Sequence, residues 1–239
     1  MDPTVLIFDT PLEAAIACGD RTLALLDEAR RERGRAMLAV SGGSTPKLMF
    51  QSMASKPFDW RGIQVFQVDE RCVPPDRAES NFRLLRESLL DPIHLPEAQI
   101  HRVHGEESAS EAAAEYTEDI RRVLGDSPVF DVIQRGMGPD AHTASLFPGE
   151  PLIFDRRGIV GVVDASRAGM KNGMRYRITL LPGVLERARH TLCLVTGTDK
   201  ARALSKVLHG PYDPIHLPSQ LASADTVWYV DKLAAGPAV

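Results

Sequence analysis

Short apolar runs alternate along the chain with longer segments of helical periodicity. Ala36–Val40 and Thr191–Thr196 are apolar runs of the kind that parallel sheets bury. Pro11–Arg33 carries apolar residues at helical spacing, which predicts an amphipathic helix that ends at Gly34. The predicted strands are 5–8, 36–40, 63–68, 99–103, 129–133, 159–163, 177–181, 191–196 and 227–230. The predicted helices are 11–33, 47–55, 82–90, 110–124, 182–188 and 201–208.

This alternation predicts an α/β fold with a mostly parallel, doubly wound sheet and helices on both faces. The Pro-rich segment 91–98 and the polar segment 164–175 resemble linkers, but neither divides the chain. We therefore expect one domain that spans residues 1–239. The hexapeptide Asp91–Pro96 recurs letter for letter as Asp213–Pro218. Because the flanking residues do not match, we interpret the two copies as similar loops.

The composition narrows the classes of function. The 239 residues are 44% hydrophobic and 25% charged, as in ordinary soluble globular proteins. A net charge of −4 argues against a nucleic-acid partner, so an anionic ligand would need locally clustered Arg and Lys. No apolar run reaches the length of a membrane span, and the first residues do not resemble a signal peptide. Three widely spaced cysteines predict neither disulfides nor a metal site, which favours the cytoplasm.

The stretch from Asp131 to Gly149 has the layout of an active site. Its apolar first half predicts a buried strand, and Gly136 and Gly138 then allow a sharp turn. Asp140 and His142 follow at the carboxyl end of that strand, where open α/β sheets bind their ligands. His142 is a candidate general base that Asp140 orients, and backbone N–H groups of the glycine turn are candidates to stabilise an oxyanion. The alternative is that this histidine has only a structural role.

A second glycine turn joins a strand to a helix near residue 44. Gly42 and Gly43 leave backbone N–H groups uncovered, and Ser44 and Thr45 add hydroxyl groups. We expect Thr45 to be the N-cap residue and Pro46 to occupy the first helical position. Free N–H groups at the positive end of a helix dipole favour an anion such as phosphate. The alternative is an ordinary strand-to-helix turn.

Charged residues follow the predicted strand 63–68 directly. Asp69, Glu70 and Arg71 would be costly there unless they are paired or face a cleft. We interpret Arg71 as a ligand-binding cation that an acid orients; a solvated loop or a simple ion-pair bridge is the alternative. Arg177 and Lys200 are further candidate phosphate partners, with Arg175 as a weaker substitute for Arg177. Cys72 has no base beside it in the sequence and is not predicted to be a nucleophile.

The segment Gly136–Gly149 closely resembles the signature of the 6-phosphogluconolactonases, which usually reads G-x-G-x-D-G-H-T-A-S-L-F-P. Ser41–Pro46, Val68–Pro74 with Ser80-Asn81, and Arg177–Leu180 resemble the same family in the same order, so the resemblance covers about residues 10 to 230. It implies the fold shared by sugar-phosphate isomerases and CoA transferases. It also implies hydrolysis of 6-phospho-D-glucono-1,5-lactone in the oxidative pentose phosphate pathway, without metal or cofactor.

The resemblance also implies roles for individual residues. It makes His142 the general base that activates water, with Asp140 as the second catalytic residue. The implied substrate-binding residues are Gly42, Gly43, Ser44, Thr45, Asp69, Arg71, Gly138, Arg177 and Lys200. The small sugar-phosphate lactone is the expected partner, with no nucleic acid and no membrane, and we expect a monomer.

Three positions depart from the family pattern. Ala141 replaces a glycine between Asp140 and His142, Arg135 replaces an aliphatic strand residue and faces either solvent or the site, and 181–183 replaces a threonine. One alternative is a glucosamine-6-phosphate deaminase or isomerase, but that family places a glutamate where this chain reads Thr143–Pro148. The other is a non-catalytic sugar-phosphate-binding protein, against which the acid, the histidine and the arginine argue.

Overall fold

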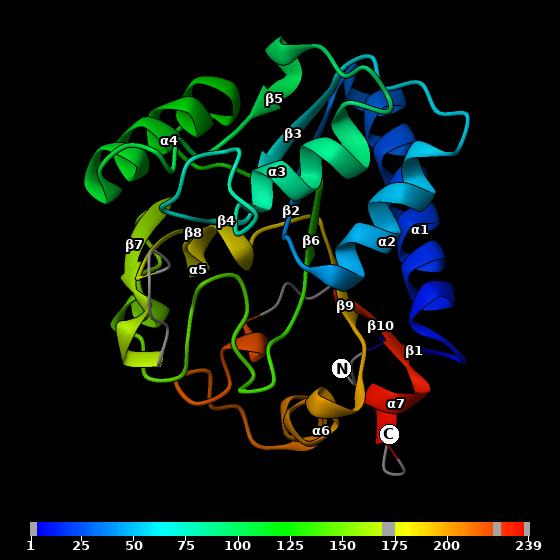
Figure 1. Cartoon of the computed structure of the whole chain (residues 1–239), viewed down its shortest axis with the longest axis vertical. Coiled ribbons are helices and arrows are strands. Elements are labelled where there is room, and N and C mark those ends of the chain that lie inside the picture. The colour runs from blue at the N-terminus through cyan, green and yellow to red at the C-terminus, as the bar shows by residue number, and fades with distance from the viewer. Residues whose placement is uncertain (1–3, 169–174, 222–225, 237–239) are drawn as a thin grey trace.

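A parallel β-sheet forms the centre of the protein (Figure 1). The computed structural model describes residues 4–168, 175–221 and 226–236. Seven strands of these residues form the sheet, and each neighbouring pair is parallel. In spatial order they are β1 (Thr4–Phe8), β10 (Thr226–Asp231), β9 (His190–Val195), β6 (Val132–Arg135), β2 (Ala36–Val40), β3 (Ile63–Gln67) and β5 (Ile100–His101). The predicted mostly parallel sheet is therefore confirmed.

Helices cover both faces of the sheet, as the doubly wound prediction requires. The helices α1 (Pro11–Arg33) and α2 (Ser44–Ala54) pack on one face against alternate strand residues such as Leu38 and Val132. The intervening residues Ala39 and Ile133 point to the other face, where α4 (Ala109–Leu124) packs. Figure 1 shows these helices on opposite sides of the sheet. The remaining helices are α3 (Asn81–Leu85), which continues as a π-helical turn (Arg86–Leu90), α5 (Pro182–Leu185), α6 (Ala201–His209) and α7 (Lys232–Ala235).

The helix α1 has the boundaries that the sequence predicts. Thr10 and Glu13 form a capping box at its start, and Gly34 ends it in a left-handed conformation with φ 74°. Gly19 lets α2 approach closely, because a Cβ there would lie 3.1 Å from the side chain of Met53. This close packing fixes α2, whose N-terminus points to the carboxyl end of the sheet.

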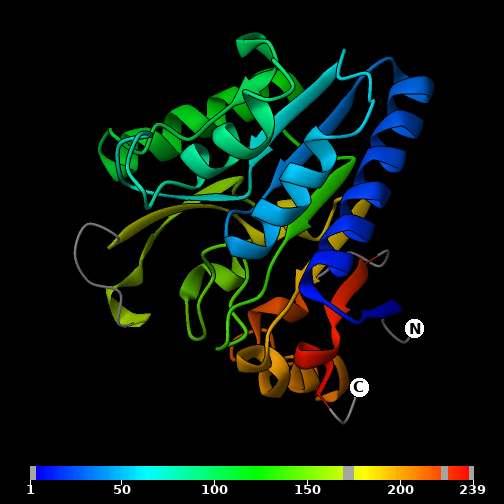
Figure 2. The same cartoon turned by 45° about the vertical axis from the view of Figure 1, so that its right-hand side comes forward.

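A second, antiparallel sheet was not predicted from the strand–helix alternation. It contains β4 (Asp69–Arg71), β8 (Tyr176–Leu180) and β7 (Val160–Asp164), and Figure 2 shows it projecting beside the main sheet. No helix separates β7 from β8 among the residues described, apart from a short 3₁₀ turn at Ala165–Ala168. Two consecutive strands without a crossover helix pair antiparallel. The charged segment 69–71 pairs with β8, so it is a strand of this sheet and not a loop.

The central strand lies at 132–135 instead of the predicted 129–133. His101 is buried in β5, stacked on Phe66 and 2.8 Å from oxygens of both Asp119 and Gln64. Polar partners on a neighbouring strand and on α4 satisfy its ring, which no local pattern reveals. Among the described helices, none is long and apolar enough to cross a membrane.

Candidate active site

A cavity of about 250 Å³ opens at the carboxyl ends of β2, β6 and β9, beside the antiparallel sheet. The structure thus brings the glycine turn near residue 44, the strand β4 and the central motif together. The predicted residues that line the cavity are Gly42, Gly43, Ser44, Thr45, Asp69, Arg71, Gly138, His142, Arg177 and Lys200. Asp140 does not line the cavity itself but contacts His142, which does. The roles of all these residues stay predictions, whereas their convergence on one cavity is observed.

The helix α2 begins two residues earlier than predicted. Its N-cap is Gly43, which adopts φ 123°, a value that favours glycine, and Ser44 is the first helical residue. Thr45 is therefore not the N-cap, and Pro46 is the third helical residue. The Thr45 hydroxyl instead lies 2.6 Å from the hydroxyl of Thr196, which also lines the cavity.

The backbone at this helix start is open to a ligand. The first N–H group that donates within the helix is that of Lys47, to the carbonyl of Gly43 at 3.1 Å. The N–H groups of Ser44 and Thr45 have no acceptor among the residues described, as expected for a helix start that binds an anion. Gly42 must be a glycine, since a Cβ there would lie 2.1 Å from the Asn81 side-chain oxygen.

Two arginines face each other on the antiparallel sheet. Arg71 of β4 and Arg177 of β8 are directly opposite in register, and Arg177 is only 6% exposed. Burial and the neighbouring Arg71 lower the pKa of Arg177, whereas Asp69 raises it. The Nε atoms of both arginines are buried without a hydrogen-bond partner among the residues described. Two adjacent cations with spare donors are stable beside a bound anion.

The acid next to Arg71 does not orient its guanidinium as predicted. Both oxygens of the buried Glu70 carboxylate accept hydrogen bonds, one of them from the backbone N–H of Arg71 at 2.7 Å. The Arg71 guanidinium donates to the carbonyl of Glu79 instead. Burial raises the pKa of Glu70, and hydrogen bonds from neighbours such as Asn81 oppose that rise. Glu70 therefore fixes the backbone of β4 and the start of α3. It influences the Arg71 side chain only indirectly, through these backbone contacts.

Asp69 lies in the cavity and is itself held in place. The Ser145 hydroxyl donates to the Asp69 carboxylate at 2.7 Å, and the Thr179 hydroxyl accepts from the Ser145 N–H at 3.2 Å. These bonds connect the central motif to the antiparallel sheet. Cys72 next to this strand is no nucleophile, because burial raises the pKa of its thiol to about 11.

His142 and Asp140 form the hydrogen-bonded pair that the sequence predicts. The Asp140 carboxylate lies 2.5 Å from Nδ1 of the His142 ring and also accepts from the His142 backbone N–H at 3.1 Å. Partial burial raises the pKa of Asp140, but the hydrogen bonds and charge of His142 outweigh burial and leave this pKa below its usual value. A carboxylate partner fixes the proton of the neutral ring on Nδ1, so Nε2 keeps a lone pair. The ring packs against Phe147 with centroids 4.7 Å apart.

Between Asp140 and His142 the backbone is left-handed at Ala141, where φ is 67°. This conformation costs alanine about 1 kcal/mol relative to glycine. Gly138 packs against the His142 ring, because a Cβ there would lie 2.1 Å from two ring atoms. The N–H of Gly138 donates to the carbonyl of His142 at 2.9 Å. This N–H is therefore not available for an oxyanion, which corrects that part of the prediction.

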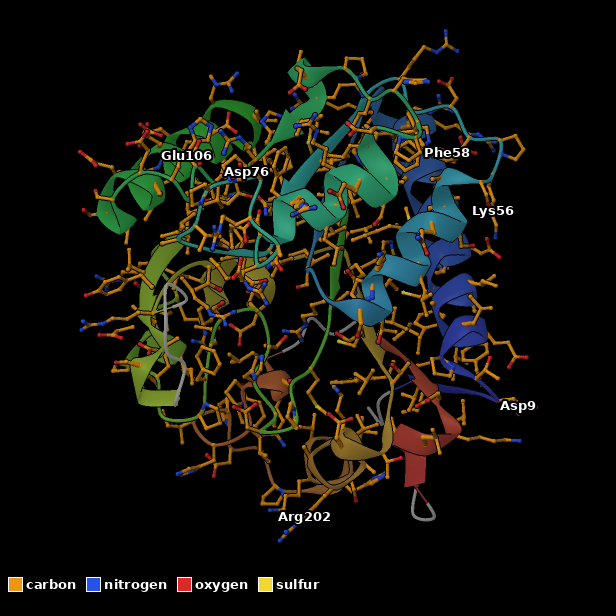
Figure 3. All side chains as sticks on the ribbon, in the orientation of Figure 1. Asp9, Lys56, Phe58, Asp76, Glu106 and Arg202 are labelled. Carbon is orange, nitrogen blue, oxygen red and sulfur yellow. The ribbon has the colours of Figure 1, made fainter. Side chains whose placement is uncertain are left out.

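Other cations divide into those at the cavity and those outside it. Lys200 lines the cavity and pairs with Asp199 at 2.8 Å. Arg202 of α6 points outward at the periphery (Figure 3). Arg175 pairs with Asp164 at 2.7 Å on the exposed side of the antiparallel sheet, which supports Arg177 over Arg175 as a phosphate partner.

Arg135 reaches neither solvent nor the cavity. It is 1% exposed, and its three guanidinium nitrogens have no partner among the residues described.

Some residues of the cavity were missed. Asn81 is among them, although Ser80-Asn81 is part of the family resemblance, and so is Thr196, the last residue of a predicted strand. Asn81 donates from its side chain to the carbonyl of Asp69 at 3.0 Å. The other missed residues are Ser41, Pro46, Gly136, Met137, Ala144 and Leu194. In the part of the chain that the structure describes, no three His, Cys, Asp or Glu side chains are grouped to bind a metal.

The sequence matches a known family. Residues 9–228 match the family model described as glucosamine-6-phosphate isomerases/6-phosphogluconolactonase. The chain belongs to this family. A 6-phosphogluconolactonase of Synechocystis sp. is 33% identical over 230 residues, which cover 93% of this chain and 92% of the relative. One of Treponema pallidum is 36% identical over 186 residues, 75% of each chain.

Solved structures of this family have the same fold. The 6-phosphogluconolactonase of Trypanosoma cruzi superposes with a TM-score of 0.88 at 28% identity, covering 99% of this chain and 97% of that one. A monomeric glucosamine-6-phosphate deaminase superposes with a TM-score of 0.82 at 18% identity, covering 97% and 98%, which shows a shared fold alone. The family and fold expected from the sequence motifs are therefore confirmed.

Proposed function

We propose that the protein hydrolyses 6-phospho-D-glucono-1,5-lactone to 6-phospho-D-gluconate, a step of the oxidative pentose phosphate pathway. One observation carries the proposal: two paired arginines, each with a buried Nε that has no partner among the residues described, share a cavity with a histidine that a carboxylate orients. The first feature suits a phosphorylated substrate, and the second suits attack by water. The relatives named 6-phosphogluconolactonase support the same substrate.

The phosphate is assigned to the positive part of the cavity. The N–H groups at the start of α2 and the ammonium of Lys200 both face this space. Arg71 and Arg177 close it from the antiparallel sheet. We expect inorganic phosphate or sulfate to bind at the Gly42–Thr45 turn within reach of these cations.

The lactone carbon is assigned to the side of His142. Nε2 takes a proton from water while the water oxygen bonds to C1, which gives a tetrahedral alkoxide. The C1–O5 bond then breaks, and the ring oxygen leaves with the proton that His142 returns. The product acid ionises, and the imidazole is regenerated. Asp140 stabilises the protonated ring between the two proton transfers. No metal or organic cofactor enters these steps.

Two other functions compete with this one. A glucosamine-6-phosphate deaminase or isomerase would need its glutamate, and no glutamate lines the cavity among the residues described. A non-catalytic sugar-phosphate-binding protein would not need the Asp140–His142 pair, which here is hydrogen-bonded and faces the cavity. The hydrolase is therefore favoured over both.

Residues 1–239 are proposed to act as one domain and as a monomer in the cytoplasm. The bonds from Ser145 to Asp69 and Thr179 link the two sheets into one site, which supports a single unit. Cys18, Cys72 and Cys193 are all free, as expected in a reducing compartment.

The proposal is tested with purified protein that contains no dehydrogenase. Lactone hydrolysis is followed by proton release at slightly acidic pH, and the spontaneous rate is subtracted. Two charged hydrogen bonds to the phosphate, at about 1.5 kcal/mol each, predict that kcat/KM exceeds that for unphosphorylated glucono-1,5-lactone by about a hundredfold. A rate no higher than the background would contradict the proposal. Ammonia release from glucosamine 6-phosphate would indicate the deaminase instead.

A further inference from the structure

The segment 213–221 packs behind the loop that carries His142, and Ser219 is its point of contact. The Ser219 N–H donates to the carbonyl of Ala141 at 3.0 Å. The Ser219 hydroxyl lies 2.9 Å from the same carbonyl and 3.2 Å from that of His142, so its one proton is shared between them. Ser219 is 1% exposed, and Gly149 donates to the carbonyl of Ile215 at 2.7 Å nearby.

These bonds hold the strained part of the loop. Ala141 is the left-handed residue, and its carbonyl direction is set by the same φ and ψ that place Asp140 and His142 on either side. Asp140 then accepts from both the backbone and the ring of His142. If the Ala141 peptide rotated, the His142 N–H and ring would move relative to the carboxylate.

Ser219 is itself fixed to the body of the protein. Gln220 accepts from the N–H of Asp213 at 2.7 Å and donates to the carbonyls of Pro211 at 3.0 Å and Val207 at 3.3 Å. Val207 belongs to α6, so the contact connects the loop to a helix of the core.

The two copies of the repeated hexapeptide differ in backbone conformation. In the first copy, 91–96, His94 adopts φ 53°. In the second copy, 213–218, none of the non-glycine residues described has a positive φ. The same six residues therefore adopt different backbones, and only the second copy leads into a serine that holds the loop of His142.

We propose that Ser219 is a positioning residue that holds the Ala141 carbonyl and thereby aims the His142 imidazole at Asp140 and the cavity. The proposal rests on the proposed role of His142 as general base. Ser219 does not touch the cavity, so it acts on the reaction only through the loop.

The test is the Ser219→Ala variant, assayed well below its thermal midpoint. A general base displaced by about 1 Å loses up to about 10²-fold in rate, so we expect kcat to fall about 10-fold to 10²-fold with KM within twofold. In NMR spectra, the His142 Nδ1 proton that Asp140 binds should exchange faster with water than in the wild type. This readout does not depend on the substrate, so it still tests the positioning role if the lactone is not hydrolysed.

A matched control separates positioning from stability. Thr22 of α1 also donates a buried hydroxyl to a backbone carbonyl, that of Cys18 at 2.8 Å, away from the cavity. Thr22→Val should lower the thermal midpoint while leaving kcat unchanged. If Ser219→Ala behaves like Thr22→Val, with normal kcat and a normal His142 proton, Ser219 has only a structural role and the proposal is overturned.

A double substitution gives the sharpest readout. Glycine adopts the left-handed conformation without support, so Ala141→Gly in the Ser219→Ala background should recover at least half of the lost kcat on a logarithmic scale. Purely additive effects of the two substitutions would contradict the proposed coupling between Ser219 and Ala141.

Discussion

Glu70→Gln exchanges one oxygen of a buried carboxylate for an NH₂ group. All the hydrogen-bond partners of Glu70 are donors, so the site is complementary to the ionised acid. They are the side chains of Gln67 and Ser80 and the backbone N–H groups of Arg71, Asn81 and Phe82, at 2.7 to 3.0 Å. Oε2 accepts three of these bonds and Oε1 accepts two.

The number of hydrogen-bond donors left without an acceptor determines how much stability Glu70→Gln loses. In the better orientation of glutamine, the NH₂ group replaces Oε1 and faces the N–H groups of Arg71 and Asn81. Two backbone N–H groups without an acceptor cost about 1–3 kcal/mol each. The neutral glutamine offsets part of this loss, because no charge is then buried. We expect the free energy of unfolding to fall by about 2–4 kcal/mol.

Urea unfolding followed by circular dichroism measures this loss. The exposed Glu87, whose side chain pairs with Arg83 at 2.7 Å, provides the control, because Glu87→Gln should leave the urea midpoint unchanged. Because Glu70 fixes the backbone of Arg71, KM for the phosphorylated lactone should rise as well. A Glu70→Gln protein as stable as the wild type would refute the view that the ionised carboxylate holds β4 against α3.

Three further predictions concern the cavity. Arg71→Ala and Arg177→Ala should each raise KM at least tenfold with a smaller effect on kcat, because both arginines line the part of the cavity to which we assign the phosphate; steady-state kinetics measure kcat and KM separately. Ala141→Gly alone should change kcat less than threefold, since φ is already 67°, and a turnover raised by orders of magnitude would reveal a distorted site. The lowered pKa of Asp140 adds stability that is complete above about pH 4 and is lost as pH falls through the folded pKa. Asp140→Asn should therefore be less stable than the wild type at pH 7, with a difference that vanishes in acid; equal stabilities at pH 7 would argue against the pair.

Features encoded within one segment could be predicted from the sequence. The glycine turn, Asp140 and His142 lie within seven residues, so the motif alone places the acid beside the imidazole. The predicted helix 82–90 begins within one residue of α3 for a similar reason, because the Ser80 side chain caps α3 by accepting from the N–H of Arg83 three residues later. Local spacing along the chain determines these contacts, so they can be predicted from the sequence.

Features that depend on distant segments were missed. The antiparallel sheet joins residues 106 positions apart where Arg71 pairs with Arg177, and no local pattern encodes that register. Ser219 reaches a loop 78 residues earlier in the chain. Thr45 was assigned as the N-cap on side-chain preference, whereas Gly43, with its positive φ, is the N-cap and starts the helix two residues earlier. Tertiary packing outweighs local propensity at each of these positions.

His142 is proposed as the general base for water attack on the lactone. Background-corrected lactone hydrolysis by the wild type and by His142→Ala tests this role. We expect kcat to fall by about 10²–10⁴-fold while KM changes little. A His142→Ala protein with near wild-type kcat would contradict the mechanism.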